Sequence, residues 1–376
     1  MRPKERCLIA LSHREPDRVP MNYHADGNMS KQLKKYFGIK ENKNRSCWLT
    51  GNEDPQLLEA LDCDFRALVP EYVGPPVKIN PDGSFIGMFG EYLLIRENPN
   101  GSAYFEYPYL PLANAKTVEE VDAHRWPRVE WFDFSTIKEQ LDESEDYAIF
   151  GGDMGTLDCI NRCLTLFGYE RVMVGMAERD PLLLRAFQRL SNFYYDYLKR
   201  LFEVGGKRID IAYFGEDLGT QNGPRISLAM YKELIQPLWI RHIELAKKYG
   251  YITMQHSCGS TRAFYPEFIK MGINVHDTVQ IYTANMNPVE IKREFGDKLC
   301  FHGGISIQRV LQTGTREDVA EEVKRVIDAL APNGGYILAP THWIQSGTPI
   351  ENVITMYQTA KEYSTEFYKK RKTKIS

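Results

Sequence analysis

The chain has 376 residues, enough for two average domains or for one large barrel with insertions. Its 47 Lys and Arg residues against 50 Asp and Glu residues give a formal net charge of −3, and these charges are spread along the sequence, which argues against a nucleic-acid-binding protein. No run approaches about 18 uncharged apolar residues, so no membrane segment is expected. Seven cysteines without disulfide-scaffold spacing favour the reducing cytoplasm.

The first part of the chain mixes short helical and extended segments. We expect a helix at 3–12, an extended segment at 21–24, polar helical sequence from about 29 to 60 and a strand at 64–70. Two strand-like runs, 84–96 and 102–107, flank a turn at 98–101. They predict a β-hairpin inserted near residues 84–108. Acid-rich helical sequence is expected at 111–141.

From residue 147 onward, strand-like and helical segments alternate regularly. Strands are expected near residues 147, 209, 251, 274, 299 and 336, each followed by helical sequence, the longest at 156–204. The segments near 21 and 65 bring the count to eight. Because parallel strands need crossover helices and eight such units close a sheet, the sequence predicts an α/β fold, a (β/α)8 TIM-type barrel. We expect one domain over residues 1–376.

Polar residues gather at the predicted carboxyl ends of the strands, where barrel enzymes place their active sites. Five of the eight histidines fall there. The residues at these ends are His24, Asp26, Glu71, Asp153, Glu216, Asp217, His256, Cys258, His276, Asp277, His302 and His342. This pattern predicts a catalytic or metal-binding mouth. For His276 and His302 a hydrogen bond to a loop carbonyl is the competing interpretation.

The stretch 255–260, Gln-His-Ser-Cys-Gly-Ser, carries the sharpest metal signal. Side chains alternate along a strand, so His256 and Cys258 point to the same side, and both are good zinc ligands. A catalytic zinc needs three protein ligands, and His342 is the candidate for the third, with Glu216 or Asp217 as an alternative carboxylate. Two neutral imidazoles and one thiolate would leave a net charge of about +1 and favour activation of an ether.

Other residues of the mouth are candidates for catalysis and substrate binding. We expect Glu216 and Asp217 to orient ligands or shuttle protons, and we count His24 and Asp153 as further catalytic candidates. The candidates for substrate binding are Tyr23, Asp26, Tyr72, Tyr213, His302 and Trp343.

Several motifs together resemble the uroporphyrinogen decarboxylase superfamily. They are Glu15-Pro-Asp-Arg-Val-Pro20, the segment 216–224, His256-Ser-Cys-Gly259, the segment 295–304, and the segment 334–342 with Pro349-x-Glu-Asn352. The resemblance spans nearly the whole chain and implies a (β/α)8 barrel. It also implies one of two activities, cofactor-free decarboxylation of a porphyrinogen or zinc-dependent methyl transfer with a corrinoid protein.

Two places in the sequence favour the methyltransferase branch of this superfamily. The decarboxylases carry an arginine-rich segment after the Val-Pro motif, whereas residues 21–27 contain no arginine. The His-x-Cys zinc motif of the methyltransferases is present as His256 and Cys258. Their usual last cysteine is replaced by His342, which also resembles a histidine of the decarboxylases.

The leading hypothesis is therefore a zinc-dependent methyltransferase, such as an O-demethylase component or a methylcobalamin:thiol methyltransferase. It would act on a small methyl ether or thiol, with methylcobalamin or another corrinoid carried by a separate partner protein, since the chain lacks the D-x-H-x-x-G cobalamin motif. The sequence leaves a homodimer open. One alternative is a metal-free decarboxylase or lyase with His342 as general acid and Asp26 or Asp153 steering charge; another is a non-catalytic ligand-binding barrel.

Overall fold

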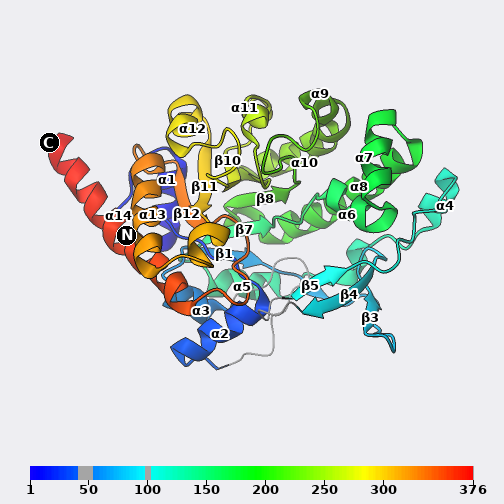
Figure 1. The fold of residues 1–376 in the computed structure, drawn as a ribbon, viewed down its shortest axis with the longest axis horizontal. Coiled ribbons are helices and arrows are strands. Elements are labelled where there is room, and N and C mark those ends of the chain that lie inside the picture. Colours follow the sequence, from blue (N-terminus) through cyan, green and yellow to red (C-terminus); the bar gives the residue numbers. More distant parts are fainter. Residues whose placement is uncertain (41–53, 98–102, 376) are drawn as a thin grey trace.

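The structure, a computed structural model, describes residues 1–40, 54–97 and 103–375. Its centre is a parallel sheet in the order β1-β7-β8-β9-β10-β11-β12 (Figure 1). The strand bounds are β1 Phe65–Leu68, β7 Ala148–Gly152, β8 Ile211–Gly215, β9 Ile252–His256, β10 Val275–Val279, β11 Cys300–Ile305 and β12 Tyr336–Pro340. Neighbours in this sheet are consecutive along the chain once the β1–β7 insertion is passed, which is the order of a barrel.

Residues 20–22 supply the eighth strand position, called the first stave here because it comes first in the chain, and they close the barrel between β12 and β1. Met21 forms a parallel bridge with Leu338, the Asn22 amide donates to the Leu338 carbonyl at 2.9 Å, and the Asp64 amide donates to the Met21 carbonyl at 2.9 Å. The predicted (β/α)8 barrel is thus confirmed, with a first strand that is only a bridge long.

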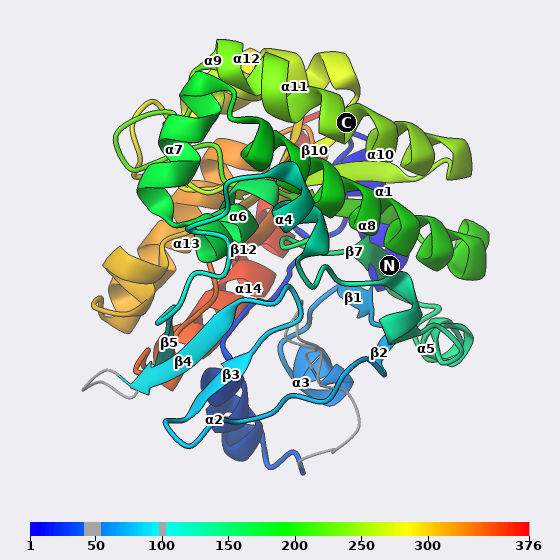
Figure 2. The ribbon, with the colours of Figure 1, turned by 90° about the vertical axis from the view of Figure 1, so that its right-hand side faces the viewer.

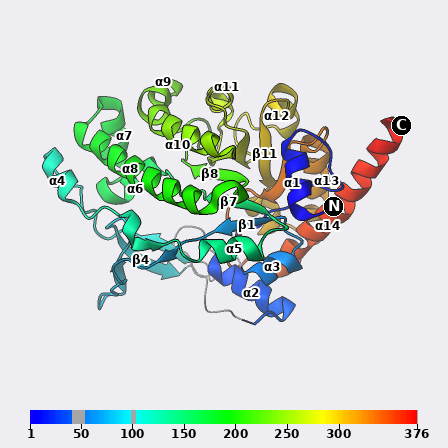
Figure 3. The ribbon, with the colours of Figure 1, turned by 180° about the vertical axis from the view of Figure 1, so that it is seen from behind.

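Helices cover the outside of the barrel, and Figure 3 shows α8 running across it and α14 projecting towards the C terminus. The helices at least seven residues long are α1 Pro3–Leu11, α2 Gly27–Phe37, α5 Ile137–Glu143, α6 Cys159–Phe167, α7 Tyr169–Glu178, α8 Pro181–Gly205, α10 Gln236–Tyr249, α11 Tyr265–Met271, α12 Pro288–Phe295, α13 Arg316–Leu330 and α14 Ile350–Ile375. The shorter ones are α3 Pro55–Ala60, α4 Val118–Ala123 and α9 Leu228–Met230. None of the described helices is long and apolar enough to cross a membrane.

The helical sequence expected at 156–204 is divided into three helices, because Gly168, at φ +92°, separates α6 from α7, and Pro181 starts α8 after a left-handed Arg179. The acid-rich helix expected at 111–141 is wrong in detail, because the region holds the short α4, a 3-10 turn at Val129–Trp131, a small strand, β6 Phe132–Asp133, and most of α5.

The predicted hairpin is part of a three-stranded antiparallel sheet beside the barrel (Figure 2). Strands β4 Tyr92–Glu97 and β5 Ala103–Glu106 form the hairpin, and β3 Ser84–Ile86 pairs with β4 on its other side. Its turn at 98–101 lies outside the described residues, as do residues 41–53 of the polar segment. Strand β2 Glu71–Tyr72 pairs separately with β6.

The barrel interior below the mouth is a packed apolar core distinct from the layer beneath the helices. Its members are Cys7, Leu11, Phe65, Ala148, Phe150, Ile211, Tyr213, Met254, Val275, Cys300 and Ile337. Because this apolar core fills the lower part of the barrel, polar side chains that point inward near the carboxyl ends of the strands face the mouth.

The Asp-Arg-Val-Pro motif after the first helix has a structural role at the barrel closure. The fully buried Asp64 carboxylate accepts hydrogen bonds from Arg6 Nη1 at 2.6 Å, Arg18 Nη1 at 2.8 Å and the Met21 amide at 2.8 Å. Two guanidinium groups therefore compensate one buried charge and fix the short first stave against β1.

We expect Arg18→Ala to lower the free energy of unfolding by about 1.5–3 kcal/mol, because it removes charge-assisted hydrogen bonds to a buried carboxylate. Urea unfolding of zinc-free protein measures the loss. The matched control is Arg2→Ala, whose exposed contact with Asp146 is 3.4 Å long and should matter by no more than about 0.5 kcal/mol. Equal losses in the two variants would contradict this role of Arg18.

Candidate functional site

Strand register brings three polar residues of the barrel interior side by side. Asp277 of β10 is paired with His256 of β9 on one side and with His302 of β11 on the other. In parallel strands, residues paired in this way project to the same face, so all three side chains point into the barrel. His276, the neighbour of Asp277, points the other way and its Nε2 lies 3.0 Å from the Thr261 hydroxyl.

Asp217, His256 and Cys258 place one potential ligand atom each within 4.8 Å of one another. His256 Nε2 lies 3.5 Å from Cys258 Sγ and 3.6 Å from Asp217 Oδ1. Zinc bonds of about 2.0–2.3 Å in a tetrahedron put neighbouring ligand atoms about 3.3–3.8 Å apart. The imidazole, thiol and carboxylate therefore fit three corners of a tetrahedral site, and Asp217 and Cys258 remain partly accessible to solvent.

The His256 ring is oriented by Asp277. Its Nδ1 lies 2.6 Å from Asp277 Oδ2, so the proton of the neutral ring sits on Nδ1 and the lone pair of Nε2 faces Cys258 and Asp217. A carboxylate behind the histidine is the usual arrangement around a metal-ligating imidazole. The contact between His256 and Asp277 is therefore a second observation, besides the spacing of the three ligand atoms, that fits a metal site.

The pKa shifts of these groups follow from burial and from each other. Burial alone would lower the pKa of His256, but Cys258 and Asp277 raise it well above its usual range. Burial raises the pKa of the Cys258 thiol despite the imidazole beside it. Burial would raise the pKa of Asp217, but His256 and the backbone amide of Cys258 lower it. Before a metal binds, the site therefore holds an imidazolium, a thiol and a carboxylate near neutral pH.

A buried network extends from Asp277 across the barrel. Its Oδ1 lies 2.5 Å from His302 Nδ1, and the Tyr213 hydroxyl donates to its Oδ2. Burial would raise the pKa of Asp277, but the rings of His302 and His256 hold it well below its usual range. The carboxylate therefore stays ionised and accepts from three side chains.

Asn22 carries this network to the first stave. Its Nδ2 lies 3.0 Å from Nε2 of both His302 and His24, so the amide donates to two rings. Burial, with His302 close by, lowers the pKa of His24 to about 3. His24 is thus a neutral imidazole at the inner wall of the mouth.

Asp217 and Glu216 are adjacent in sequence but have different environments. Asp217 accepts from the Cys258 amide at 2.9 Å and from Asn161 Nδ2 at 3.1 Å, which fix its carboxylate beside the thiol. Glu216 accepts from the amides of Cys159 and Ile160, each at 2.9 Å, and so caps the start of α6. Burial and the nearby Asp158 raise the pKa of Glu216 well above its usual value.

Asp217, His256 and Cys258 are called the donor group below, because each offers a ligand atom for a metal. His342 lies at the mouth beside this donor group but is not part of it. It lines a cavity of about 410 Å³ together with Asp217 and Cys258, and its side chain is exposed. Desolvation at the mouth lowers the pKa of His342, and the positive charge of His256 lowers it further. The carboxylate of Asp217 takes the position beside His256 and Cys258 that the sequence assigns first to His342.

The remaining predicted site residues are spread over several environments. Asp153 is buried at the end of β7, which raises its pKa to about 6, and its Oδ1 accepts from the Gly155 amide. Trp343 donates from Nε1 to Met154 Sδ at 3.0 Å. Asp26 caps α2 through the Met29 amide.

Two of the predicted aromatic residues lie outside the barrel interior. Tyr23 is buried beneath the helices, with its hydroxyl 3.2 Å from Ser30 Oγ and its ring 6.3 Å from that of Tyr357. Tyr72 lies on the short β2 and donates to the Pro75 carbonyl at 3.2 Å.

Three residues that support the donor group have no individual role in the sequence analysis. Asp277 is placed there among the residues of the mouth, whereas Asn22 and Asn161 are not named. The side chains of Asn22 and His24 are two residues apart and so lie on the same, inward face of the extended segment. Strand alternation is therefore a signal for Asn22. No comparable signal marks Asn161, which lies inside α6.

The barrel has known relatives. A solved structure described as a methyltransferase from Methanosarcina mazei superposes with a TM-score of 0.61 at 17% identity, covering 96% of this chain and 99% of that one, which supports the fold. A methylcobamide:CoM methyltransferase of Methanosarcina acetivorans is 29% identical over 176 residues, which are 46% of this chain and 47% of that protein. A second one, from Methanosarcina mazei, is 24% identical over 249 residues, 60% of this chain and 68% of its own length.

This chain therefore spans about half the length of the first of these relatives. The sequence model of the family Uroporphyrinogen decarboxylase (URO-D) matches residues 144–363, more than half of the chain. That range includes the donor group and Asp277. The resemblance inferred from the motifs is confirmed: the chain belongs to the uroporphyrinogen decarboxylase family, and the relatives that match it are named methyltransferases.

Proposed function

We propose that this chain is a zinc-dependent methyltransferase that moves a methyl group between a small substrate and a corrinoid carried by a separate protein. The observation that supports it most is the donor group of Asp217, His256 and Cys258 at the open end of the barrel, with Asp277 behind the histidine. The names of the matching relatives support the methyl transfer and the cobamide.

His256, Cys258 and Asp217 would hold the zinc beside the cavity that Asp217 and Cys258 line. Bound there, zinc acts as a Lewis acid that favours the thiolate form of a thiol or polarises an ether oxygen. Asp277 keeps the proton of His256 on Nδ1, and Asn161 with the Cys258 amide keeps the Asp217 carboxylate in place.

The ligand set changes the choice between the two substrate types. One neutral imidazole, one thiolate and one carboxylate leave a zinc site with a net charge of about 0, against about +1 for two imidazoles and a thiolate. A less positive metal is a weaker Lewis acid, so the charge argument for an ether no longer holds. With Asp217 as the third ligand, a thiol substrate is as well supported as a methyl ether.

His342, exposed beside Cys258, is placed to contact the substrate. Its lowered pKa keeps the ring neutral near pH 7, so it can accept or donate one hydrogen bond without adding a charge. The corrinoid protein would dock over the carboxyl ends of the strands, because its cobalt must reach the substrate held there.

The direct test measures zinc content and methyl transfer together. Protein purified without a histidine tag should contain about one zinc per chain, and it should change the absorbance of free methylcobalamin when a suitable thiol is added. Zinc near zero after growth in zinc-replete medium, with turnover of a carboxylic acid substrate, would favour the metal-free lyase instead.

We expect zinc binding to weaken steeply as the pH falls. His256 is an imidazolium and Cys258 a thiol in the metal-free site, so binding must release roughly two protons, and the apparent affinity should fall by about 100-fold per pH unit in that range. Zinc affinity falls towards low pH, rather than rising, because the raised pKa values of His256 and Cys258 keep both ligands protonated there. Calorimetry in buffers of different ionisation enthalpy counts the protons; a count near zero would mean that the site is already deprotonated and would contradict this protonation state.

A further inference from the structure

The cavity beside the donor group is lined mainly by uncharged polar side chains. It has a volume of about 410 Å³ and is formed by the loops after five consecutive strands, β8 to β12. Its lining contains no lysine, arginine or glutamate, and Asp217 is its only carboxylate. A volume of this size suits a small organic molecule and is within the range of ordinary ligand pockets.

Five glutamines line this cavity, and four of them are free to bind a ligand. Gln280 is used by the fold, since its Oε1 accepts from the Gly259 amide and its Nε2 donates to the Thr341 carbonyl, each at 3.0 Å. The other four have side-chain amides without a hydrogen-bond partner in the described part of the chain: Gln221, Gln308, Gln312 and Gln345. An amide both donates and accepts, so this wall matches hydroxyl, ether and amide groups.

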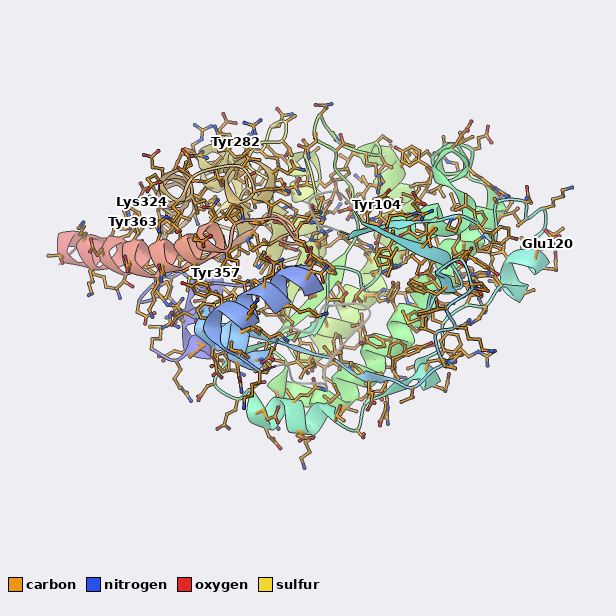
Figure 4. All side chains as sticks on the ribbon, turned by 60° about the horizontal axis from the view of Figure 1, so that its bottom comes forward. Tyr104, Glu120, Tyr282, Lys324, Tyr357 and Tyr363 are labelled. Carbon is orange, nitrogen blue, oxygen red and sulfur yellow. The ribbon has the colours of Figure 1, made fainter. Side chains whose placement is uncertain are left out.

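Three charged residues, Arg309, Glu322 and Arg325, lie behind the lining and contact it through Tyr282 and Ser306. Tyr282, labelled in Figure 4, lines the cavity and donates to Glu322, whose other oxygen accepts from the Ser306 amide at 2.7 Å. Arg325 Nη2 lies 3.2 Å from Glu322 Oε2, and Arg309 Cζ stacks 4.2 Å from the Tyr282 ring centroid. Apart from the zinc itself, an anionic group would therefore find no cation in the lining, and a cationic group would find only Asp217, which is engaged with the metal site.

From this lining we infer that the small substrate is uncharged and carries hydrogen-bonding oxygen or nitrogen groups besides the atom that exchanges the methyl group. The inference rests on the proposed function, because it assigns the cavity to the substrate of that site. It adds the substrate class: a neutral polar thiol or methyl ether rather than a sulfonate, carboxylate or ammonium compound. Ile281 and Ile307 in the same wall suit an apolar or aromatic portion.

Two pairs of probes that differ in charge test the inference on the zinc-loaded chain. The thiol pair is 2-mercaptoethanol and 2-mercaptoethanesulfonate; the ether pair is 4-hydroxy-3-methoxybenzamide and 4-hydroxy-3-methoxybenzoate. Calorimetry or ligand-observed NMR at pH 7.5 and constant salt should give the neutral member at least roughly tenfold tighter binding in each pair, because the lining offers an anionic group no lysine or arginine to pair with. Equal or tighter binding of the anionic member would overturn the inference and assign Arg309 as its cation.

A charge introduced into the wall provides the second readout. Gln308→Arg should improve the relative affinity of the anionic member by roughly fivefold or more, whereas Gln32→Arg, on the exposed face of α2, should not. An unchanged preference in Gln308→Arg would place binding elsewhere and overturn the inference, as would no binding of any probe to the unaltered chain. Failure of the proposed function has a different signature, namely absent zinc and no thiol binding, while the ether pair still reports on the cavity.

Discussion

We expect the Cys258→Ala chain to purify almost free of zinc. Zinc sites with four protein ligands bind with an apparent free energy of about 10–16 kcal/mol, or about 3–4 kcal/mol per ligand, so loss of the thiolate should weaken binding by about 10²–10³-fold. The side chain lies within 3.5 Å of His256 Nε2 and is small, so its removal leaves the fold intact. Metal analysis and competition with a chromophoric chelator measure the change.

Two further variants identify the third ligand. If Asp217 is the ligand, Asp217→Ala should lose zinc as Cys258→Ala does, while His342→Ala should keep about one zinc per chain and lose turnover or raise KM. The opposite pattern, with zinc lost from His342→Ala and kept in Asp217→Ala, would restore the ligand set His256, Cys258 and His342. In that case His342→Cys should recover much of the affinity, because it supplies a thiolate at the same place.

The barrel itself could be predicted from the sequence because its signals are local and repeated. Buried parallel strands are short apolar runs, and each is followed by helical sequence, so counting them gives the architecture even where their ends are uncertain. The break at Gly168 could have been read from the glycine. The segment near Met21 is counted among the eight strands, but its reduction to a single bridge could not be predicted, because its pairing depends on Leu338, more than 300 residues away.

The candidate site was predictable only as far as strand periodicity reaches. His256 and Cys258 share a face by alternation, and the structure brings them together. The same alternation separates Tyr23 from His24, which cannot both face the mouth, and Tyr23 lies beneath the helices. Past a strand end the rule is unreliable. It still holds for Cys258, two residues after β9, but after β8 only tertiary contacts decide that Glu216 turns to α6 and Asp217 to Cys258.

The second large effect is expected at Asp277, which links the donor group to the barrel interior. Asp277→Ala would leave three buried donors without their acceptor, namely His256 Nδ1, His302 Nδ1 and the Tyr213 hydroxyl. Each stranded donor costs about 1–3 kcal/mol, so the free energy of unfolding of the zinc-free protein should fall by about 3 kcal/mol or more. Urea unfolding measures this loss.

Zinc affinity should fall in the same variant by about 10–100-fold, since the His256 ring would lose the partner that fixes its tautomer and direction. Asp277→Asn separates the two effects: it preserves the volume and one acceptor but removes the charge, so it should recover part of the stability and less of the affinity. Asp153→Asn is the control, because this buried carboxylate lies at the end of β7, three strands from β10, bonds to Gly155 and Thr156 of its own turn and should leave zinc affinity within about threefold. If Asp277→Ala lowered stability but left zinc affinity unchanged, the carboxylate would be a packing partner of the barrel and His256 would not depend on it for its orientation.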